Sequence, residues 1–504
     1  MLNRTRAIVS AAALALGAGL FAAPVSAESL RDAIALAYRT NPTIQAQRAL
    51  QRSLDETVVQ ARAGLRPELN VSATASYSRS DVAGTGLDLD GDGVPDITTG
   101  GVTETDSGAV SIGLRQTLYS GGRVARNISA AEAGVLEGRE TLRDAEQRLV
   151  VTVVQAYVDV LRDLEILRVR QENLQVLRRQ LEESNARFEV GEITRTDVAQ
   201  SEARLAQSES DLASAQAQLS TSRAAYAAVV GQTPSELRAP TPLAGLPADF
   251  DSALDVALQR NPSFLAAVYN QRQAEAGVAV ARAAYGPTAS LTASYGGSDQ
   301  LEGFDPSRST RFSAGASVSV PLFTGGLNRS RVAQALEQAT AAQAQVAAER
   351  RSVLQSVSAA FANLVSSRAG VTANEEAVRA ARVAAEGVRQ EQQVGLRTTL
   401  DVLNAELELR SAEISLAVAR RNDYVAQAQL LAAMGVLDAA SLAEVETYDA
   451  AANYERVRRR GALPWDFVVE TLDRLGAPAI RSSSAGQSAP IDRDLGAEVV
   501  RTAP

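Results

Sequence analysis

The residues of this chain that could do chemistry are carboxylates in one short segment. Four aspartates stand at positions one, three, five and nine of that segment: Asp88, Asp90, Asp92 and Asp96. With Gly93 at position six, this is the spacing of a calcium-binding loop. Thr99 takes position twelve, where such a loop has a closing glutamate. The segment therefore predicts either a weak calcium site or a solvated acidic loop, and no other cofactor is expected.

The sequence contains no histidine and no cysteine. Imidazole catalysis, thiolate metal sites, disulfide bonds and lipid attachment through cysteine are therefore excluded. An enzyme would need carboxylate or Ser/Lys chemistry, and the sequence offers no converging cluster of such residues. We expect no catalytic activity.

The first 27 residues have the pattern of a secretory signal peptide. Arg4 and Arg6 precede an apolar stretch, and Val25-Ser26-Ala27 forms a cleavage site of small residues before Glu28. Removal of the two arginines leaves 48 basic residues against 59 acidic ones, a net charge of −11. Nucleic acid is a poor partner for such a chain. No later stretch has about 20 consecutive apolar residues, so membrane insertion would require a closed β-barrel.

Two halves of the chain repeat each other. Leu118-Tyr119-Ser120-Gly121-Gly122 matches Leu322-Phe323-Thr324-Gly325-Gly326 at an offset of 204 residues, and Val190-Gly191 matches Val394-Gly395 at the same offset. Asn41-Pro42 and Asn261-Pro262 start a helix in each half, since proline suits the first helical turn. The offset between the two Asn-Pro pairs differs from the 204 residues of the other motifs. This difference indicates an insertion or deletion within the polar segments 80–107 and 296–310, which we expect to be loops.

Long helices dominate both halves. Val153, Val160, Leu167, Leu174, Leu181 and Phe188 step by seven, as do Val357, Leu364, Val371, Val378 and Ala385. Seven-residue steps indicate coiled-coil packing. A helix over residues 123–190 would be roughly 100 Å long, and the return helix to about residue 230 roughly 60 Å. A helix over 42–64 adds about 35 Å, so we expect these two to stack end to end beside the long one.

Four segments alternate with period two and predict strands. They begin at Val71, Val110, Leu291 and Phe312, and the fourth runs to Leu322. One face of each is apolar, and the other is small and polar, as in a wall between lipid and water or in a soluble sandwich with one wet face. Four strands are too few to enclose a lumen, so the chain must pool its strands with other copies of itself.

The Val-Gly turns, the Leu-aromatic-Ser/Thr-Gly-Gly strand ends and the Asn-Pro helix starts together resemble the TolC family of outer-membrane channel proteins. The resemblance covers residues 28–437 in both repeats. It implies a mainly α chain with membrane β: a homotrimer with a twelve-stranded β-barrel in the outer membrane of a Gram-negative bacterium. This barrel would continue into a twelve-helix α-barrel of coiled-coil hairpins across the periplasm.

The predicted organisation follows the repeats. After the signal peptide (1–27) come a first repeat (28–231), a linker (232–250), a second repeat (251–437) and a C-terminal equatorial segment with a tail expected to be disordered at its end (438–504). Each repeat holds a strand pair, at about 67–120 and 287–324, and a helical hairpin, at 123–231 and 327–437.

The resemblance also implies a periplasmic gate near the two turns. Its residues in this chain are Thr196, Asp197, Gln392, Arg397, Asp401 and Asn404. Arg397 takes the place of a gate-locking arginine, while Gln392 and Asn404 depart from a family tyrosine and a second acidic position. Three copies of Asp401 around a pore would favour cations, and Arg397 would offset their repulsion through Asp197 of a neighbouring copy. Helix capping is the alternative role of both aspartates.

The implied function is a passive exit duct for an inner-membrane ABC or proton-driven transporter. A periplasmic adaptor protein would contact the helix tips at Val190, Gly191, Val394 and Gly395. We favour type I protein secretion, because residues 361–437 look most like that branch of the family, and small-molecule efflux is the alternative. A periplasmic coiled-coil scaffold, with the strands as a soluble module, is the remaining class.

Overall fold

The computed structural model describes residues 28–91, 93 and 97–493. The predicted signal peptide, at 1–27, and the end of the tail, at 494–504, lie outside the described residues. The described chain is mainly helical with one small sheet, which confirms the predicted fold class.

Six elements occur twice in the same order: two short helices, two strands and two long helices. The first set is α1 (Leu30–Thr40), α2 (Pro42–Ala63), β1 (Glu68–Leu87), β2 (Ile97–Tyr119), α3 (Arg123–Glu189) and α4 (Arg195–Val230). The second set is α5 (Phe250–Arg260), α6 (Pro262–Ala283), β3 (Thr288–Asp299), β4 (Thr310–Ser319), α7 (Leu327–Gln393) and α8 (Thr399–Ala433). Three short helices follow: α9 (Ala439–Ala443), α10 (Ala450–Val457) and α11 (Asp466–Leu475).

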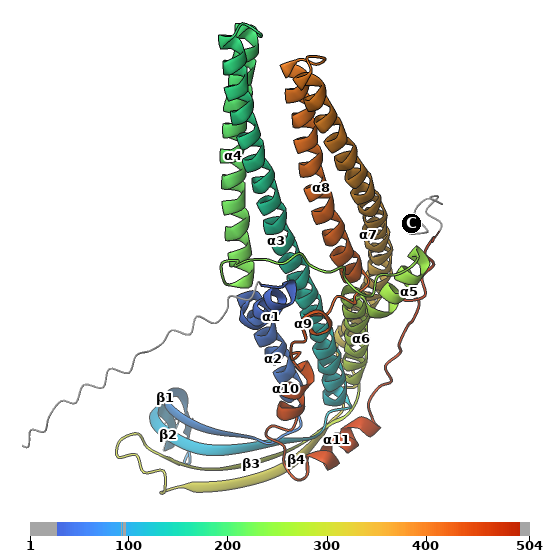
Figure 1. Ribbon diagram of the computed structural model, residues 1–504. Coiled ribbons are helices and arrows are strands. Elements are labelled where there is room, and N and C mark those ends of the chain that lie inside the picture. The colour runs from blue at the N-terminus through green and yellow to red at the C-terminus, as the bar shows by residue number, and fades with distance from the viewer. Residues whose placement is uncertain (1–27, 92, 94–96, 494–504) are drawn as a thin grey trace, which may run out of the picture.

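The long helices α3 and α7 run from the level of the sheet to the tips of the hairpins (Figure 1). Of the apolar residues spaced by seven, Val153 and Val160 in α3 are fully buried, and so are Val357 and Leu364 in α7. Phe188, at the end of the α3 series, is exposed because the helix stops one residue later. As predicted, α4 lies beside the upper part of α3 and α2 beside the lower part (Figure 1).

The Asn-Pro pairs hold the stacked helices together. Asn41 accepts a hydrogen bond from the Thr43 N–H, which caps α2, while its side-chain amide donates to Val229 O at the end of α4. Asn261 likewise caps α6 and donates to Ala433 O in α8 at 2.9 Å. One side chain therefore satisfies an unpaired N–H at the start of one helix and a free carbonyl at the end of another.

Two hydrophobic clusters, larger than the third one described, lie at this mid-height junction. A cluster around Tyr157 and Tyr226 joins α1, α3, α4, α8 and α9, and a second around Phe361 joins α5, α6, α7 and α8. A third cluster, around Val58 and Val135, joins α2 and α3 nearer the sheet. Because α8 contributes to both larger clusters, the two repeats share one core at this level.

The strands form one antiparallel sheet in the order β1-β2-β3-β4. One face carries serine hydroxyls that pair across neighbouring strands: Ser72 with Ser111, Ser76 with Ser107, Ser290 with Ser317 and Ser294 with Ser313. The other face exposes large apolar side chains: Val71, Tyr77, Phe312 and Val318. The predicted alternation is confirmed, and β1 and β4 are the outer strands of the described sheet.

Three strand boundaries differ from the prediction: the end of β1, the start of β2 and the end of β4. Most of the segment 80–107, expected to be a loop, continues β1 and β2, and Arg79 pairs with Glu104 across them at 3.2 Å. In contrast, β4 ends at Ser319, so Val320 and Leu322 lie outside the strand. The polar composition of the first segment concealed an antiparallel pairing with a register shift between Val82 and Thr85, in which exposed side chains need not be apolar.

The C-terminal segment fastens the place where sheet and helices meet. Asp473, on α11, is fully buried and accepts hydrogen bonds from the backbone N–H groups of Ser120, Gly122 and Ala125 at the start of α3. An anion at a helix N-terminus satisfies unpaired N–H groups and complements the helix dipole. Residues 478–493 then run back along α6 and α7 towards α5 (Figure 1).

Within the described residues, no helix combines the length and the apolar character that a bilayer span requires.

Candidate functional site at the ends and facing sides of the hairpins

Each helical hairpin reverses at a glycine. The first hairpin is α3 with α4, the second α7 with α8. Gly191 and Gly395 have φ values of +80° and +79°, a left-handed conformation that glycine adopts without strain. The Gly191 N–H donates back to Phe188 O at 3.0 Å, which closes the turn. Val190 and Val394 are exposed beside these glycines, and contact of all four residues with an adaptor stays a prediction.

Asp197 and Asp401 both belong to capping boxes. The Asp197 carboxylate accepts bonds from the Thr194 N–H at 2.9 Å and the Thr194 hydroxyl at 2.8 Å. The Asp401 carboxylate accepts the equivalent bonds from Thr398 at 3.0 and 2.8 Å. These bonds lower the pKa of both carboxyl groups, and the bond from the backbone N–H has the larger effect in each case. Both groups therefore stay charged at neutral pH. Within one chain, both aspartates therefore act as helix caps, the alternative role named above. Their role around a pore stays a prediction.

Arg397 bonds to a residue that was not predicted. Its Nε donates to Glu391 Oε2 at 2.8 Å, and this bond raises the pKa of the exposed guanidinium. The expected bond to Asp197 involves a neighbouring copy and stays a prediction. Gln392, at the position of the family tyrosine, is buried, and its Nε2 has no hydrogen-bond partner within the described chain.

The remaining predicted gate residues lie on α4 and α8. Thr196 is exposed in the first turn of α4. Asn404 accepts a hydrogen bond from Arg204 of α4 at 3.3 Å. Of the six predicted gate residues, Asn404 therefore contacts the opposite hairpin directly, near the tips.

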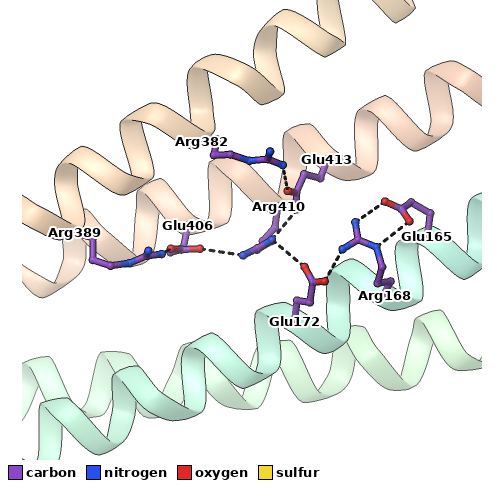
Figure 2. Close-up of polar contacts among 8 residues, drawn as sticks. All are labelled: Glu165, Arg168, Glu172, Arg382, Arg389, Glu406, Arg410 and Glu413. Atoms are coloured by element: carbon purple, nitrogen blue, oxygen red, sulfur yellow. Dashed lines mark hydrogen bonds and ion pairs between the residues drawn. The ribbon is translucent and has the colours of Figure 1, made fainter.

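Below the tips, a set of charged side chains crosses from one hairpin to the other (Figure 2). We call it the inter-hairpin network; it consists of Glu165, Arg168 and Glu172 on α3, Arg382 and Arg389 on α7, and Glu406, Arg410 and Glu413 on α8. Arg410 lies at its centre. Its Nη1 atom lies 2.8 Å from the Glu413 carboxylate and 3.5 Å from the Glu172 carboxylate. Its Nη2 atom lies 3.5 Å from the Glu406 carboxylate.

Burial makes this network more than a surface ion pair. The Glu406 side chain is 2% exposed and also pairs with Arg389, and the Arg410 side chain is 12% exposed. At its outer end, Arg168 binds Glu172 at 2.5 Å and Glu165 at 2.6 Å, and its bonds to Glu165 lower the pKa of that carboxyl group. The enclosed part of the network is therefore Glu406, Arg410 and Glu413, and the other five side chains are about half exposed or more.

A second polar contact joins the hairpins nearer the core. Arg421 of α8 donates to Asp159 of α3 at 2.8 Å, and Arg162 contacts the same carboxylate at 3.0 Å. Sequence reasoning missed both contacts. The spacing of Glu406, Arg410 and Glu413 by four and three residues marks one helix face, but nothing local to α8 identifies α3 as its neighbour.

The predicted calcium loop is described only in part. The Asp88 carboxylate accepts bonds from the N–H groups of Gly91 and Gly93, both at 2.7 Å, while Asp92 and Asp96 lie outside the described residues. Among described residues, no group of three or more acidic side chains has the arrangement of a metal site. Calcium binding by Asp88, Asp90, Asp92 and Asp96 stays a prediction.

Comparisons with known proteins point to one family. The sequence profile of a family described as "Outer membrane efflux protein" matches residues 33–232 and 253–436. Outer membrane efflux protein BepC of Brucella suis biovar 1 (strain 1330) is 34% identical over 455 residues, 90% of this chain and 95% of BepC. Outer membrane protein TolC of Escherichia coli (strain K12) is 27% identical over 433 residues, 83% of this chain and 84% of TolC.

Two further matches bear on function and fold. Alkaline protease secretion protein AprF of Pseudomonas aeruginosa is 28% identical over 426 residues, 82% of this chain and 85% of AprF. The crystal structure of the Campylobacter jejuni CmeC outer membrane channel superposes with a TM-score of 0.70 at 16% identity, covering 85% of this chain and 89% of CmeC.

Proposed function

Because the chain belongs to the outer membrane efflux protein family, it is an outer-membrane channel protein and not an enzyme, and we propose that it forms the passive exit duct of a tripartite exporter. In this proposal three copies assemble into one channel. An adaptor protein in the periplasm and an inner-membrane transporter deliver the substrate to it.

The observation that supports the proposal is that the sheet is open at both edges. It exposes an apolar face and a serine face, and its outer strands β1 and β4 each present one edge. Exposed strand edges invite pairing with another chain. Pairing β4 of one copy with β1 of the next would close a twelve-stranded sheet from three copies, with the apolar face towards lipid and the serine face towards water.

Fractionation of cells tests this assembly. We expect the mature protein to need detergent for extraction and to migrate as a trimer that heat dissociates. A monomer released by osmotic shock would instead identify a periplasmic scaffold, the alternative in which the strands form a soluble module.

For the substrate we propose unfolded secreted proteins delivered by an ABC transporter. The similarity to AprF, whose name refers to protease secretion, supports this choice. The name of BepC, an efflux protein, supports the alternative of small-molecule export with a proton-driven pump.

Deletion of the gene separates the two substrate classes. Protein secretion predicts that specific proteins disappear from the culture medium while drug tolerance is unchanged. Loss of drug tolerance with an unchanged set of secreted proteins would refute our choice. Crosslinking from Gly395→Cys, a unique thiol in this chain, would identify the adaptor at the helix tips.

A further inference from the structure

The short helix α11 directs an apolar face away from the rest of the chain. Phe467 is 71% exposed and Leu475 is 81% exposed, and Val468 and Leu472 on the same side are also exposed. The chain-facing side carries Val469 and Asp473, which are buried. Residues one turn apart share a helix face, so the apolar residues form one outward stripe.

This orientation is fixed by polar contacts. Asp473 accepts bonds from the start of α3, and Asp466 at the N-terminal end of α11 pairs with Arg66 at 3.0 Å. The Arg66 guanidinium also donates to Arg460 O at 2.7 Å, just before α11. Rotating the helix to bury its apolar stripe would leave Asp473 and the N–H groups at the start of α3 unsatisfied, which is costly for buried groups.

The location of α11 suggests what covers the stripe. The helix lies where the strands end and the long helices begin, and it runs across the direction of α3 (Figure 1). The sheet begins at the same level and extends away from the helices (Figure 1), and its strands expose apolar residues such as Val71 and Phe312. If the sheet crosses the outer membrane, α11 lies at the surface of the bilayer that faces the periplasm.

The residues before α11 fit such a surface. Arg456, Arg458, Arg459 and Arg460 precede the helix, and Trp465 is its N-terminal flanking residue, half exposed. Arginine attracts anionic lipid headgroups, and tryptophan is enriched at the level of the headgroups. Residues 456–475 hold five arginines and three acids, and two of the arginines, Arg458 and Arg460, also pair with Glu455 and Glu56.

We propose that residues 456–475 form a membrane-surface anchor, in which α11 lies on the periplasmic leaflet of the outer membrane with its apolar stripe among the lipid chains. Such helices insert about 5–10 Å into the boundary between headgroups and acyl chains. The proposal rests on the proposed function, because it requires the sheet to be in the membrane. A lipid surface fits better than a second copy of the chain, because basic residues and tryptophan flank the stripe.

The chain offers a direct probe, because Trp465 is its only tryptophan. The full mature protein would be reconstituted into vesicles of phosphatidylethanolamine and phosphatidylglycerol that contain phospholipids brominated at defined depths. We expect bromine close to the headgroup to remove most of the Trp465 emission, and bromine at the chain end to remove less. Emission that resists brominated lipid but is quenched by iodide in the water would overturn the proposal.

Single thiol labels provide matched controls, since the chain has no cysteine. A fluorophore on Leu475→Cys should be quenched by shallow bromine, one on Phe312→Cys in β4 by deep bromine, and one on Leu396→Cys at the hairpin tip only by iodide. Quenching at Phe312→Cys without quenching at Leu475→Cys or Trp465 refutes the anchor but leaves the channel intact. No lipid quenching at Phe312→Cys refutes the proposed function itself.

A variant and a shielding test complete the design. Phe467→Ser with Leu472→Gln and Leu475→Gln should abolish lipid quenching of Trp465 while quenching at Phe312→Cys persists. If Leu475→Cys is shielded from lipid and from iodide alike, another copy of the chain covers α11, and the lipid anchor is wrong.

Discussion

The Arg410 guanidinium on α8 lies 3.5 Å from the Glu172 carboxylate on α3, so one side chain of the second hairpin reaches the first. The same guanidinium lies beside Glu406, whose carboxylate is almost fully enclosed. The facing sides of the hairpins are therefore joined by charge and not by an apolar seam alone. This arrangement leads to a test of stability.

We expect Arg410→Leu to reduce the free energy of unfolding by about 3–5 kcal/mol, because it leaves Glu406 buried with one of its two partners removed. The control Arg168→Leu should reduce it by about 0–1 kcal/mol, because Arg168 is half exposed. Denaturant unfolding in detergent, followed by helical circular dichroism, measures both. Adding Glu406→Leu to Arg410→Leu should restore most of the loss; no recovery would mean that the buried charge is not its cause.

Conductance in planar bilayers tests the gate. Arg397→Ala should raise the resting conductance, because it removes the cation that offsets the carboxylates at the tips. Asp401→Ala should lower the preference for cations, because it removes negative charge from the pore. Unchanged single-channel behaviour in both variants would exclude these residues from the constriction.

Glu391→Gln distinguishes the two possible partners of Arg397. If Arg397 locks the gate through Asp197 of a neighbouring copy, this substitution leaves the resting conductance unchanged. A rise equal to that of Arg397→Ala would place the lock in the bond between Arg397 and Glu391 seen within one chain.

The capping boxes predict a pH dependence at the tips. Because the pKa values of Asp197 and Asp401 are lowered in the folded chain, their stabilising effect is complete above the ordinary carboxyl pKa of about 3.9 and is lost as the pH falls through the lowered values. Hydrogen exchange at the start of α4 and α8, corrected for its intrinsic pH dependence, should therefore accelerate in acid. Amides near Val153 in the core of α3 are the control and should stay protected.

At neutral pH, Thr398→Ala should accelerate exchange in the first turn of α8 by about fivefold, the usual effect of losing an N-cap. The equivalent Thr194→Ala should act on α4 alone. Acceleration spread along both helices would contradict a local capping role.

Tyr226 and Glu28 form a buried hydrogen bond that anchors the start of the described chain. The Tyr226 hydroxyl donates to Glu28 at 2.5 Å, and burial raises the pKa of this tyrosine, so it remains a neutral donor. We expect Tyr226→Phe to reduce the free energy of unfolding by about 1.5–3 kcal/mol, as for bonds to charged groups. Tyr285→Phe, at an exposed position, should have almost no effect in the same denaturant series.

Much of the fold could be predicted because its signals are local. The Asn-Pro pairs indicate where helices start, because proline has a fixed φ that suits the first helical turn. The seven-residue spacing from Val153 to Val160 and from Val357 to Leu364 indicates which helix face packs against a neighbouring helix. These signals lie within a few turns of chain, so one sequence suffices to detect them.

Contacts between distant segments could not be predicted in this way. Arg410 and Glu172 are far apart in sequence, and each also suits a solvated helix face. Asp473 is similarly an acid in an amphipathic helix, and its burial depends on its position at the start of α3. At the turns, Asp197 and Asp401 carry a capping signal and a gate resemblance together, because capping is a contact within one chain and the gate is a contact between copies.

The equal length of α3 and α7, 67 residues each, restricts how the molecule can change size. An added heptad would lengthen a helix by about 10 Å and preserve the seam. The returning helix of each hairpin, α4 or α8, would need the same addition, and both repeats would have to change together to keep the relative height of their tips. A change in hairpin length that preserves the seam therefore requires matched heptad insertions in α3, α4, α7 and α8.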